Sequence, residues 1–516
     1  MHSDKKLYRQ LRELNCAQLL DQEIPAFDRA SSRERAQRVS LIRAVGVVFA
    51  AQGTFEQCTT VRTWLRRLLK DPEEKVRRYA MAALPKLGAG AREESELLTL
   101  LQSTQVEREK KFLGRALHKI GGEATLHVAA SASGLLPEIE QKLKANVARQ
   151  QSPSAIRLDL VLTEFADLKI YLRCRRGLED IVAEEAKDSP HFRRKFRVTD
   201  VHEGVVSLLS LAPFALADLY SLRCFATVSF VLGTLPESGP DDAPEAAVDI
   251  LARTIASPLT RTLMQTFSEG SLRYRLEFIG KSHQGGMVAP VIDRAYALCP
   301  EILNDARSAP WAIDVHALLR GRSVELRPKL TPDPRLGYRQ EDVLAASHPP
   351  LAAALARVAG RQSNEIVWDP FCGSGLELIE RALLGGVTKL YGTDLSAAAL
   401  AVAQANFSAA KLGGVEAQFT CGDFREYARV AGLGPQSVSL IITNPPMGRR
   451  IRVPNLRGLI SDLLAVAAKV LRPGGRLVLV NPLKIDLADS PLQLRRRQTV
   501  DLGGFDCRLE LYEMRS

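Results

Sequence analysis

The sequence Trp368-Asp-Pro-Phe-Cys-Gly-Ser-Gly375 carries the clearest structural signal in this chain of 516 residues. The apolar run that precedes it, 364–368, predicts a buried strand, and the segment that follows, 376–384, predicts a helix. A strand that turns through Gly-Ser-Gly into a helix places bare backbone beside a ligand. Nucleoside sites are built in this way, although a single Gly-x-Gly is weak evidence on its own.

Two later segments extend this pattern of strands that end in polar residues. Asp394 ends the apolar run 389–394 and follows Gly375 by 19 residues, the distance at which an acidic side chain meets a ribose diol. Asn444-Pro-Pro446 ends a further apolar run, 438–443. The combination of Asp-Pro-Phe-Cys-Gly-Ser-Gly with Asn-Pro-Pro resembles the S-adenosylmethionine (SAM)-dependent amino methyltransferases.

Strand-like and helix-like runs alternate from residue 364 to the end, which predicts a parallel, doubly wound sheet. Two terminal runs, 499–502 and 507–512, suit a closing antiparallel pair. That ending is typical of the seven-stranded class I SAM methyltransferases and unlike a dehydrogenase. We predict strands over 366–370, 389–394, 417–423, 438–444 and 476–481, and helices over 397–412 and 456–471.

Ligands of such a sheet bind at the carboxyl ends of its strands, where the candidate cofactor residues fall in chain order. Asp394 would accept hydrogen bonds from the ribose hydroxyls, with Leu395 beside it. Asp423 would accept from the adenine amino group, and Phe424 would pack on the ring. The alternative in each case is an ordinary structural role: a tight turn for the glycines, a strand-end cap for Asp394 and a helix N-cap for Asp423. The residues expected to line the methionine and ribose moieties are Asp369, Phe371, Gly373, Ser374 and Gly375.

Asn-Pro-Pro holds a rigid, extended backbone. The side-chain carbonyl of Asn444 and the backbone carbonyl of Pro445 then face one point, and two fixed acceptors suit a planar exocyclic amino group. Hydrogen bonds to both would aim the lone pair of that nitrogen at the SAM methyl group. The sulfonium already makes the methyl group electrophilic, so catalysis is largely positioning and desolvation. We predict that the catalytic residues are Asn444, Pro445, Pro446 and Met447.

Met447 departs from the amino-methyltransferase pattern, in which an aromatic residue follows the second proline and stacks on the target base. A thioether also contacts a ring face, but more weakly. The target atom is therefore left open at this point. Arg449 and Arg450 follow where they would reach a phosphate or a guanine edge, or else form a solvated turn.

The segment before the catalytic domain resembles the corresponding part of THUMP-containing RNA methyltransferases. It comprises Asp333-Pro-Arg-Leu-Gly-Tyr-Arg339 and a helix over 347–360 that starts with Ser-His-Pro-Pro. In that family these stretches pack over the methionine end of the cofactor. The resemblance implies that Tyr338 and His348 are cofactor neighbours, with linker and cap packing as the alternative.

The region 157–330 has an α+β pattern that resembles the start of a THUMP-type RNA-binding module with its ferredoxin-like partner. The cluster His191-Phe-Arg-Arg-Lys-Phe-Arg197 interleaves basic and aromatic residues, which suits phosphate contact together with stacking on exposed RNA bases. The alternative is a charged loop that enters a strand. The elements expected are strands over 169–175, 195–199, 204–209, 226–234, 272–280, 311–316 and 322–327, and helices over 177–187, 215–223 and 243–257.

Residues 1–150 read as wholly helical and contain a repeat with an offset of 33 residues. Arg77–Gly88 matches Lys110–Gly121, and 42–53 is a degenerate earlier copy. A period in the thirties predicts a helical solenoid, and the pattern resembles short HEAT repeats. This region holds 26 Lys and Arg against 18 Asp and Glu. It is either a face that binds RNA phosphates or a solvated spacer.

The length and the charge of the chain bear on its number of domains and on its partners. A chain of this length needs about three domains, which we place at 1–150, 157–330 and 331–516, with a linker over 149–155. The net charge of +11 and the isoelectric point near 9.3 suit a polyanionic partner. No apolar run approaches the ~20 residues of a membrane span, and the N-terminus lacks a signal-peptide core.

The eight cysteines are dispersed without a Cys-x-x-Cys pair, which indicates reduced thiols in a cytoplasmic protein and no metal site. We predict no nucleophilic role for Cys372 or Cys421, although both lie near the expected site. We also expect a monomer with no membrane association.

The functional hypothesis is a multidomain RNA methyltransferase: a HEAT-like helical solenoid, an α+β THUMP-like RNA-binding region and a C-terminal α/β class I SAM methyltransferase domain. Its resemblance implies methyl transfer from SAM to the exocyclic N2 of a guanosine, in tRNA rather than another RNA. One alternative is the same chemistry on ribosomal RNA. Another is a non-catalytic RNA-binding protein that retains SAM, which Met447 favours. Asn-Pro-Pro alone also fits DNA adenine or protein glutamine methylation, but the region before 333 argues against both.

Overall fold

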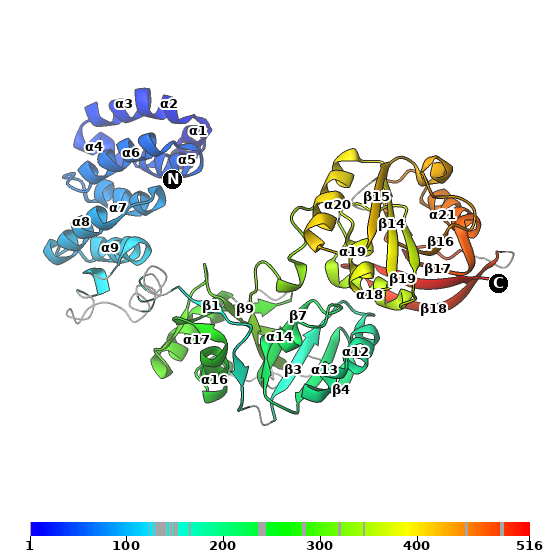
Figure 1. The fold of residues 1–516 in the computed structure, drawn as a ribbon. Coiled ribbons are helices and arrows are strands. Elements are labelled where there is room, and N and C mark those ends of the chain that lie inside the picture. Colours follow the sequence, from blue (N-terminus) through cyan, green and yellow to red (C-terminus); the bar gives the residue numbers. More distant parts are fainter. Residues whose placement is uncertain are drawn as a thin grey trace. The chain divides into compact units, whose positions relative to one another are not determined.

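A computed structural model gives the fold of the chain in two compact units (Figure 1). One unit comprises Met1–Ala155 and Leu235–Arg322, and the other comprises Ile156–Thr234 and Ser323–Ser516. The structure describes residues 2–122, 153–164, 167–235, 244–280, 285–317, 321–343, 346–448, 452–485 and 490–515, and single positions at 124–126, 128, 141, 144 and 147. The expected linker over 149–155 falls largely outside these ranges.

The N-terminal part of the first unit is a stack of helices in two layers. Helices α5, α7 and α9 pack side by side, and α6 and α8 pack against them. The two copies of the predicted repeat are α7 with η2 and, 33 residues later, α9. The helices are α1 (His2–Glu13), α2 (Cys16–Gln18), η1 (Leu19–Glu23), α3 (Ile24–Arg29), α4 (Ser32–Gln37), α5 (Ser40–Gln52), α6 (Phe55–Leu68), α7 (Glu74–Ala83), η2 (Leu84–Leu87), α8 (Ala91–Ser103) and α9 (Glu107–Ile120).

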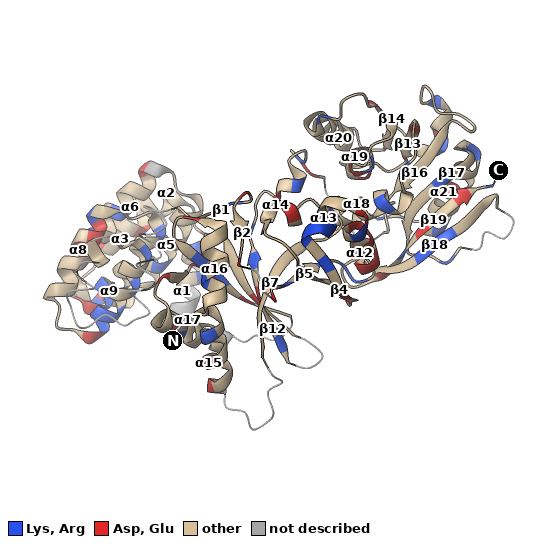
Figure 2. Cartoon of the chain, turned by 60° about the horizontal axis from the view of Figure 1, so that its bottom comes forward, with Lys and Arg blue, Asp and Glu red and all other residues tan. Residues whose placement is uncertain are grey.

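Ion pairs join parts of this stack that are distant in the sequence. Arg35 pairs with the buried Asp71 at 2.8 Å, and Arg77 pairs with the buried Glu109 at 2.6 Å. Gly88 ends the first repeat copy in a left-handed conformation, with a φ of +70°. Figure 2 shows Lys and Arg interspersed with Asp and Glu along these helices. Some of the Lys and Arg residues counted in the sequence therefore form intramolecular ion pairs.

The rest of the first unit is α/β. Strand β9 lies between β10 and β11 and is parallel to both. Arg273 on β9 forms a buried ion pair with Asp305 at 3.1 Å. Helices α16 and α17 were not expected from the sequence. The elements are α15 (Pro244–Ile255), α16 (Pro258–Phe267), β8 (Ser268–Glu269), β9 (Leu272–Ile279), α17 (Gly285–Leu298), β10 (Ile302–Asn304) and β11 (Trp311–Ala317).

The second unit begins with an α+β part whose strands follow the order β12-β7-β3-β5-β4. Strand β3 is antiparallel to both β5 and β7, and β5 is antiparallel to β4. The predicted strand, helix and two-strand return is confirmed. The elements are β1 (Ala155–Ile156), β2 (Val161–Leu162), β3 (Lys169–Arg173), α12 (Glu179–Asp188), α13 (Pro190–Lys195), β4 (Phe196–His202), β5 (Val205–Ser210), β6 (Phe214–Ala215), α14 (Leu216–Leu219), β7 (Thr227–Leu235) and β12 (Arg322–Pro328).

The basic and aromatic cluster 191–197 does not present its rings to solvent. Phe192 and Phe196 are 1% and 2% exposed, and their ring centroids lie 4.6 Å apart in the core of the α+β part. Lys195 binds Asp218 at 2.6 Å. The expectation that these aromatic residues stack on RNA bases is wrong, because the apolar face of α13 and β4 buries them.

The C-terminal part contains the predicted seven-stranded sheet, in the order β15-β14-β13-β16-β17-β19-β18. The first five strands are parallel, and β19 is antiparallel to both β17 and β18. The strands are β13 (Glu365–Asp369), β14 (Val387–Asp394), β15 (Glu416–Cys421), β16 (Val438–Thr443), β17 (Leu471–Asn481), β18 (Leu492–Asp501) and β19 (Asp506–Met514). The helices are η3 (Pro334–Leu336), α18 (Pro349–Ala359), α19 (Leu376–Leu383), α20 (Ala397–Ala410), η4 (Phe424–Arg429) and α21 (Leu456–Val470).

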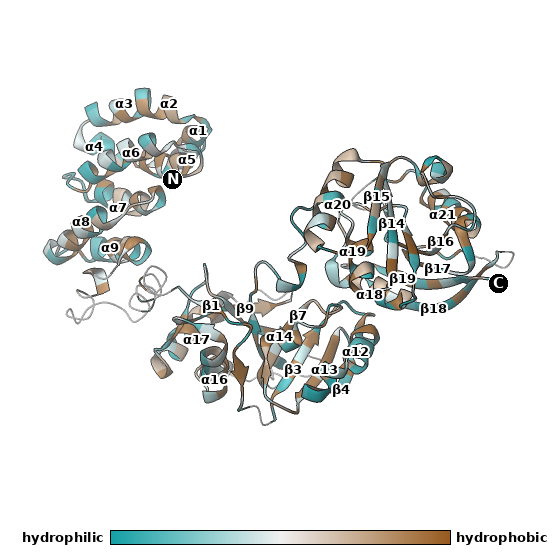
Figure 3. Cartoon of the chain, viewed as in Figure 1, coloured by the Kyte–Doolittle hydropathy of each residue, from teal (hydrophilic) through white to brown (hydrophobic). Residues whose placement is uncertain are grey.

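The middle of this sheet is apolar because helices cover it. Every residue of β16 is buried, and Figure 3 shows the hydrophobic character of β16 and β17. Buried parallel strands of this kind read as continuous apolar runs, which is why the sequence located them. Arg381 on α19 and Arg476 on β17 both pair with the buried Glu365 at the start of β13.

The two parts of the second unit meet through backbone at Gly177. Its φ is +92°, and an added Cβ would lie 1.8 Å from the carbonyl oxygen of Thr499 on β18. Gln498 donates from Nε2 to the carbonyl of Gly177 at 2.6 Å, and the amide of Asp501 donates to the carbonyl of Arg176 at 2.9 Å. This contact places the end of β3 beside the end of β18.

All eight cysteines lie in the described ranges and are unpaired thiols. Within those same ranges, no helix has both the length and the apolar character that crossing a bilayer requires.

Candidate active site

A cavity of about 1030 Å³ opens at the carboxyl ends of β13, β14, β15 and β16. The turns after these strands form one wall, and the segment before α18 forms another. The connection between β18 and β19 contributes Leu502, Gly503 and Phe505, and the α+β part contributes Arg175. Of the predicted site residues, the cavity wall contains Phe371, Gly373, Ser374, Asp394, Leu395, Asp423, Phe424, Asn444, Pro445, Pro446 and Met447.

The glycine turn after β13 presents backbone to the cavity. Gly373 has a φ of +49°, and its amide donates to Oδ2 of Asp394 at 3.0 Å. Gly375 has a φ of +81° and faces the other way, since an added Cβ would lie 3.3 Å from Cβ of Ala403 on α20. Gly375 therefore allows close packing of the turn against α20 and lies outside the cavity wall, whereas the sequence predicts that it lines the ligand.

Asp369 lies behind the cavity wall and is fully buried. Its Oδ1 accepts hydrogen bonds from Oγ1 of Thr443 at 2.6 Å and from the amide of Phe371 at 3.0 Å. Burial raises the pKa of Asp369 well above its usual value, and the nearby Glu377 raises it further. The carboxyl group thus joins the ends of β13 and β16 and shapes the turn, rather than lining the cavity as expected.

Asp394 and Asp423 both line the cavity, and each also accepts backbone hydrogen bonds. Oδ1 of Asp394 accepts from the amide of Ser396 at 2.9 Å. Asp423 caps η4 through the amide of Arg425 at 2.9 Å and pairs with the guanidinium of the same residue at 2.8 Å. A carboxylate has about four acceptor positions, so both side chains keep capacity for a ligand.

Two aromatic rings pack against each other at the cavity wall. The ring centroids of Phe371 and Phe424 lie 4.9 Å apart, and both residues line the cavity. Leu395 is 75% exposed at the rim. Aromatic rings and carboxylate acceptors on the wall of one cavity suit an adenosine moiety.

Cys372 lines the cavity but does not fit the role of a nucleophile. Burial raises the pKa of its thiol well above the usual value, and Asp369, Asp394 and Glu377 raise it further. The protonated thiol is a poor nucleophile. Cys421 is exposed, and it is not part of the cavity wall.

Asn444 directly follows the last residue of β16, and only the Nδ2 end of its amide group has a hydrogen-bond partner among the described residues. Its Nδ2 donates to Oγ of Ser347 at 2.8 Å, and Ser347 in turn donates to Oε1 of Glu377. Oδ1 of Asn444 is buried and accepts no hydrogen bond from any described residue. An orphaned buried acceptor in a cavity wall points to a ligand that donates to it.

Met447 contacts the start of β19. The thiol of Cys507 donates to the thioether sulfur of Met447 at 3.6 Å, which holds the side chain at the cavity wall. Arg449 and Arg450 lie outside the described residues. The nearest described cation in this loop is Arg452, which is exposed and lines the cavity.

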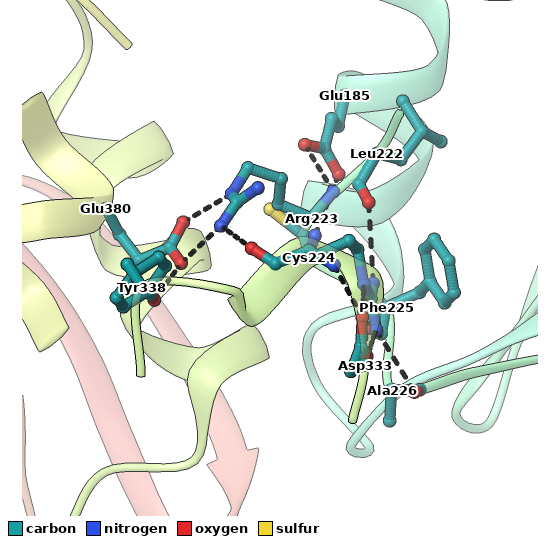
Figure 4. Close-up of polar contacts among 10 residues, drawn as sticks. Glu185, Leu222, Arg223, Cys224, Phe225, Ala226, Asp333, Tyr338 and Glu380 are labelled. Atoms are coloured by element: carbon teal, nitrogen blue, oxygen red, sulfur yellow. Dashed lines mark hydrogen bonds and ion pairs between the residues drawn. The ribbon is translucent and has the colours of Figure 1, made fainter. Parts of the chain in front are cut away.

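Tyr338 and His348 behave differently from each other. Tyr338 is buried, and its hydroxyl donates to Oε1 of Glu380 at 2.5 Å (Figure 4). Glu380 also accepts from Arg223 of the α+β part at 2.7 and 2.8 Å. Tyr338 is absent from the cavity wall and joins the two parts of the unit instead, so its expected role as a cofactor neighbour is not supported.

His348 does line the cavity and is the N-cap residue of α18. Burial, and to a lesser extent the nearby Arg175, Arg339 and Arg335, lower the pKa of its imidazole to about 4. The imidazole is therefore neutral at pH 7.

Sequence reasoning missed five residues that shape the site: Arg175, Ser347, Glu377, Asn406 and Phe505. Asn406 on α20 is fully buried and donates to the carbonyls of Ser374 at 3.0 Å and Glu341 at 3.1 Å. A polar residue in an apolar helix face was a usable signal for Asn406 and Glu377. No local pattern marks Arg175 or Phe505.

Comparison with known proteins agrees with this geometry. Residues 336–501 match the RMKL-like methyltransferase domain. The chain is 31% identical over 247 residues to a tRNA (guanine(6)-N2)-methyltransferase of Thermus thermophilus, an alignment that covers 46% of this chain and 71% of that protein. It is 30% identical over 146 residues to a tRNA (guanine(10)-N2)-dimethyltransferase of Methanocaldococcus jannaschii, covering 27% of this chain and 38% of that protein.

The fold also matches solved structures. The crystal structure of TrmN from Thermus thermophilus superposes with a TM-score of 0.52 and 22% identity, over 67% of this chain and 99% of that one. A possible methylase from Clostridium difficile superposes with a TM-score of 0.50 and 16% identity, over 67% and 98%. This chain belongs to the family of SAM-dependent RNA methyltransferases that includes the Thermus thermophilus tRNA (guanine(6)-N2)-methyltransferase.

Proposed function

We propose that this methyltransferase transfers a methyl group from SAM to the exocyclic N2 of a guanosine in tRNA. Two aligned relatives are tRNA guanine-N2 methyltransferases, and the match to one of them covers most of its length. The observation that carries the proposal is the free acceptor of Asn444, which lies in the cavity wall with no described donor.

The residues around the cavity fit SAM. The backbone of Gly373 is open to the cavity, and the carboxylates of Asp394 and Asp423 keep acceptor capacity for hydroxyl and amino groups. Bound SAM supplies a methyl group on a sulfonium, which is electrophilic without further activation. The residues that would hold it are Phe371, Gly373, Ser374, Asp394, Leu395, Asp423 and Phe424.

Asn444 and Pro445 act on the nitrogen that receives the methyl group. Oδ1 of Asn444 and the carbonyl of Pro445 each accept a hydrogen bond from one of its two N–H groups. These hydrogen bonds hold the amino group in place and direct its lone pair. Guanine N2 carries two such hydrogens, and in the free base its lone pair is delocalised into the ring. Fixed acceptors orient this group without having to reorganise as the reaction proceeds.

We place the target base against Met447 and Phe505, which both line the cavity. Cys507 holds the Met447 thioether, and Phe505 stands on the adjacent β18–β19 connection. Sulfur and an aromatic face both contact a purine favourably. The cations Arg175 and Arg452 lie on the same cavity wall and suit the flanking phosphates.

The rest of the chain would bring RNA to this cavity. We propose that 1–150 is a HEAT-like solenoid, that 157–330 is a THUMP-like RNA-binding region and that 331–516 is the catalytic domain. Stacked helices in two layers with inter-helix ion pairs support the first assignment, and the strand–helix–strand–strand order of β3, α12, β4 and β5 supports the second. Eight reduced thiols fit a cytoplasmic protein. We further propose that it acts as a monomer.

Two other functions make different predictions. Methylation of ribosomal RNA would use the same site, with the basic helices 1–150 on a larger RNA. A SAM-retaining, non-catalytic RNA-binding protein would bind SAM without turnover. Incubation of the purified protein with labelled SAM and either tRNA or ribosomal RNA fragments, followed by nucleoside mass spectrometry, distinguishes the three.

The decisive variant is Asn444→Ala. We expect it to abolish formation of N2-methylguanosine while the affinity for SAM, measured by calorimetry, stays unchanged. Asn481→Ala is the matched control, because Asn481 ends the adjacent parallel strand β17, is buried and lies outside the cavity wall. That control should lower the melting temperature and keep the turnover number. Full activity of Asn444→Ala would refute the assignment.

A further inference from the structure

We propose that Ser347 and Glu377 are positioning residues that hold the amide of Asn444 with Oδ1 directed at the substrate amino group. The three side chains form a hydrogen-bond relay: Nδ2 of Asn444 donates to Oγ of Ser347 at 2.8 Å, and Oγ donates to Oε1 of Glu377. All three residues line the cavity. The inference rests on the proposed function and extends it to how the acceptor is aimed.

The direction of the relay follows from a count of protons. The amide nitrogen of Asn444 only donates, an ionised carboxylate only accepts, and a serine hydroxyl has one proton to give. The Ser347 proton is committed to Glu377, so the lone pairs of Oγ face Asn444 and require a donor there. The Nδ2 end of the amide satisfies that requirement, and the Oδ1 end does not.

This constraint matters because the two ends of an asparagine amide have nearly the same shape. If the amide turned over, the NH2 group of Asn444 would face the NH2 group of the substrate, and two donors would meet. Oδ1 would meanwhile face the lone pairs of Ser347. Both contacts are unfavourable, so the relay selects the orientation in which the substrate nitrogen finds an acceptor.

The burial of Glu377 supports a specific task for its carboxylate. Glu377 is 3% exposed, burial raises the pKa of its carboxyl group to about 6, and no cation of the described residues is paired with it. A buried carboxyl group without a cation is costly, and an apolar residue at this position of α19 would pack at lower cost. The hydroxyl of Ser347 is the hydrogen-bond donor to this side chain.

The relay also joins parts of the site that are distant in sequence. Glu377 lies in the first turn of α19, directly after the glycine turn, whereas Ser347 precedes α18 and Asn444 ends β16. Ser347 and Asn444 are 97 residues apart, and Ser347 and Glu377 are 30 apart. The turn that faces the cofactor and the residue that faces the base are thus held by one set of contacts.

The test compares Ser347→Ala, Glu377→Leu and the double variant in steady-state methylation of tRNA. We expect each single variant to lower kcat by roughly ten- to a hundredfold, the range for losing one oriented hydrogen bond in a site of this kind. KM for tRNA and the affinity for SAM should change little. Because the residues act through one amide, the double variant should be no slower than the slower single variant.

Stability measurements separate positioning from folding. Glu377→Leu removes the acceptor of the Ser347 hydroxyl together with a buried charge and keeps a similar volume, so its melting temperature should equal or exceed that of the parent. Lower kcat in a protein that is no less stable cannot come from unfolding. Ser439→Ala is the control: Ser439 Oγ makes two hydrogen bonds of 2.9 Å to the Ile366 backbone and lies outside the cavity wall, so its loss should leave kcat unchanged.

The outcomes are distinct. Parent-like kcat in both single variants, or multiplicative losses in the double variant, would overturn the relay and leave the proposed function standing. If the parent protein itself forms no N2-methylguanosine in any RNA, the proposed function fails first. A Glu377→Leu variant whose kcat falls together with its melting temperature would assign that residue a structural role and also overturn the inference.

Discussion

Replacing Gly177 with alanine should separate the α+β part from the catalytic domain. The added Cβ would lie 1.8 Å from the carbonyl oxygen of Thr499, 2.8 Å from its carbonyl carbon and 2.9 Å from Cα of Val500. All three atoms are backbone, so no side-chain rotation relieves the overlap. The loop or β18 must move by on the order of 1 Å to restore ordinary van der Waals contact.

The expected cost has two sources. A left-handed conformation at alanine costs about 1–2 kcal/mol. The displacement also breaks the hydrogen bonds from Gln498 to the Gly177 carbonyl, 2.6 Å, and from the amide of Asp501 to the Arg176 carbonyl, 2.9 Å. Each contributes about 1 kcal/mol net. We therefore expect a loss of about 3–4 kcal/mol in the stability of this contact.

The substitution should lower the methylation of RNA and leave the affinity for SAM unchanged. Arg175 reaches the cavity through this contact, whereas the residues assigned to SAM belong to the catalytic domain. We expect Gly177→Ala to lower tRNA methylation by at least about tenfold, with calorimetric SAM affinity unchanged. Gly504→Ala is the matched control, because Gly504 has a φ of +93° and an added Cβ would meet open space. Its free energy of unfolding in urea should fall only by the cost of the backbone strain. Parent-like stability and activity in Gly177→Ala would refute the reasoning.

Two further predictions concern residues near the cavity. His348 has its pKa lowered to about 4 from 6.5, chiefly by burial, so its neutral form stabilises the fold above pH 6.5 and this contribution is lost as the pH falls toward 4. Partial exposure of the side chain reduces this contribution to about 2 kcal/mol. The free energy of unfolding in urea should therefore fall less between pH 7 and pH 5 for His348→Gln than for the parent. Tyr338→Phe removes the hydroxyl that donates to Glu380 and should cost about 1–2 kcal/mol in the same assay, with SAM affinity unchanged because Tyr338 lies outside the cavity wall. A Tyr338→Phe protein with weakened SAM binding would restore its expected role as a cofactor neighbour.

Hydrophobic periodicity located the catalytic sheet because its central strands are buried on both faces. The run 438–443 is uniformly apolar in the sequence and fully buried in the structure. In a doubly wound sheet, strand ends converge on one edge, so Asp394, Asp423 and Asn444 could be grouped before any coordinates. The same reasoning misplaced Asp369 and Gly375, which sit at a strand end and in the glycine turn but face inward.

Local composition did not separate buried from exposed aromatic residues. The cluster 191–197 reads as a base-stacking surface, yet Phe192 and Phe196 pack in the core, because the alternation of a strand and one helical turn places both rings on the inner face. An interleaved basic and aromatic pattern is the same in both cases. Only the position of the neighbouring strands decides which face is covered.

By itself, the sequence determined the order of elements, the class of sheet and the residues at its strand ends, because these depend on local periodicity and on chain order. The tertiary structure alone decided which side chains act together. The relay of Asn444, Ser347 and Glu377 joins three segments, and Arg175 enters the cavity through the Gly177 contact with β18. Hydrogen-bond direction and close backbone approach are properties of pairs brought together by folding, and no single segment carries them.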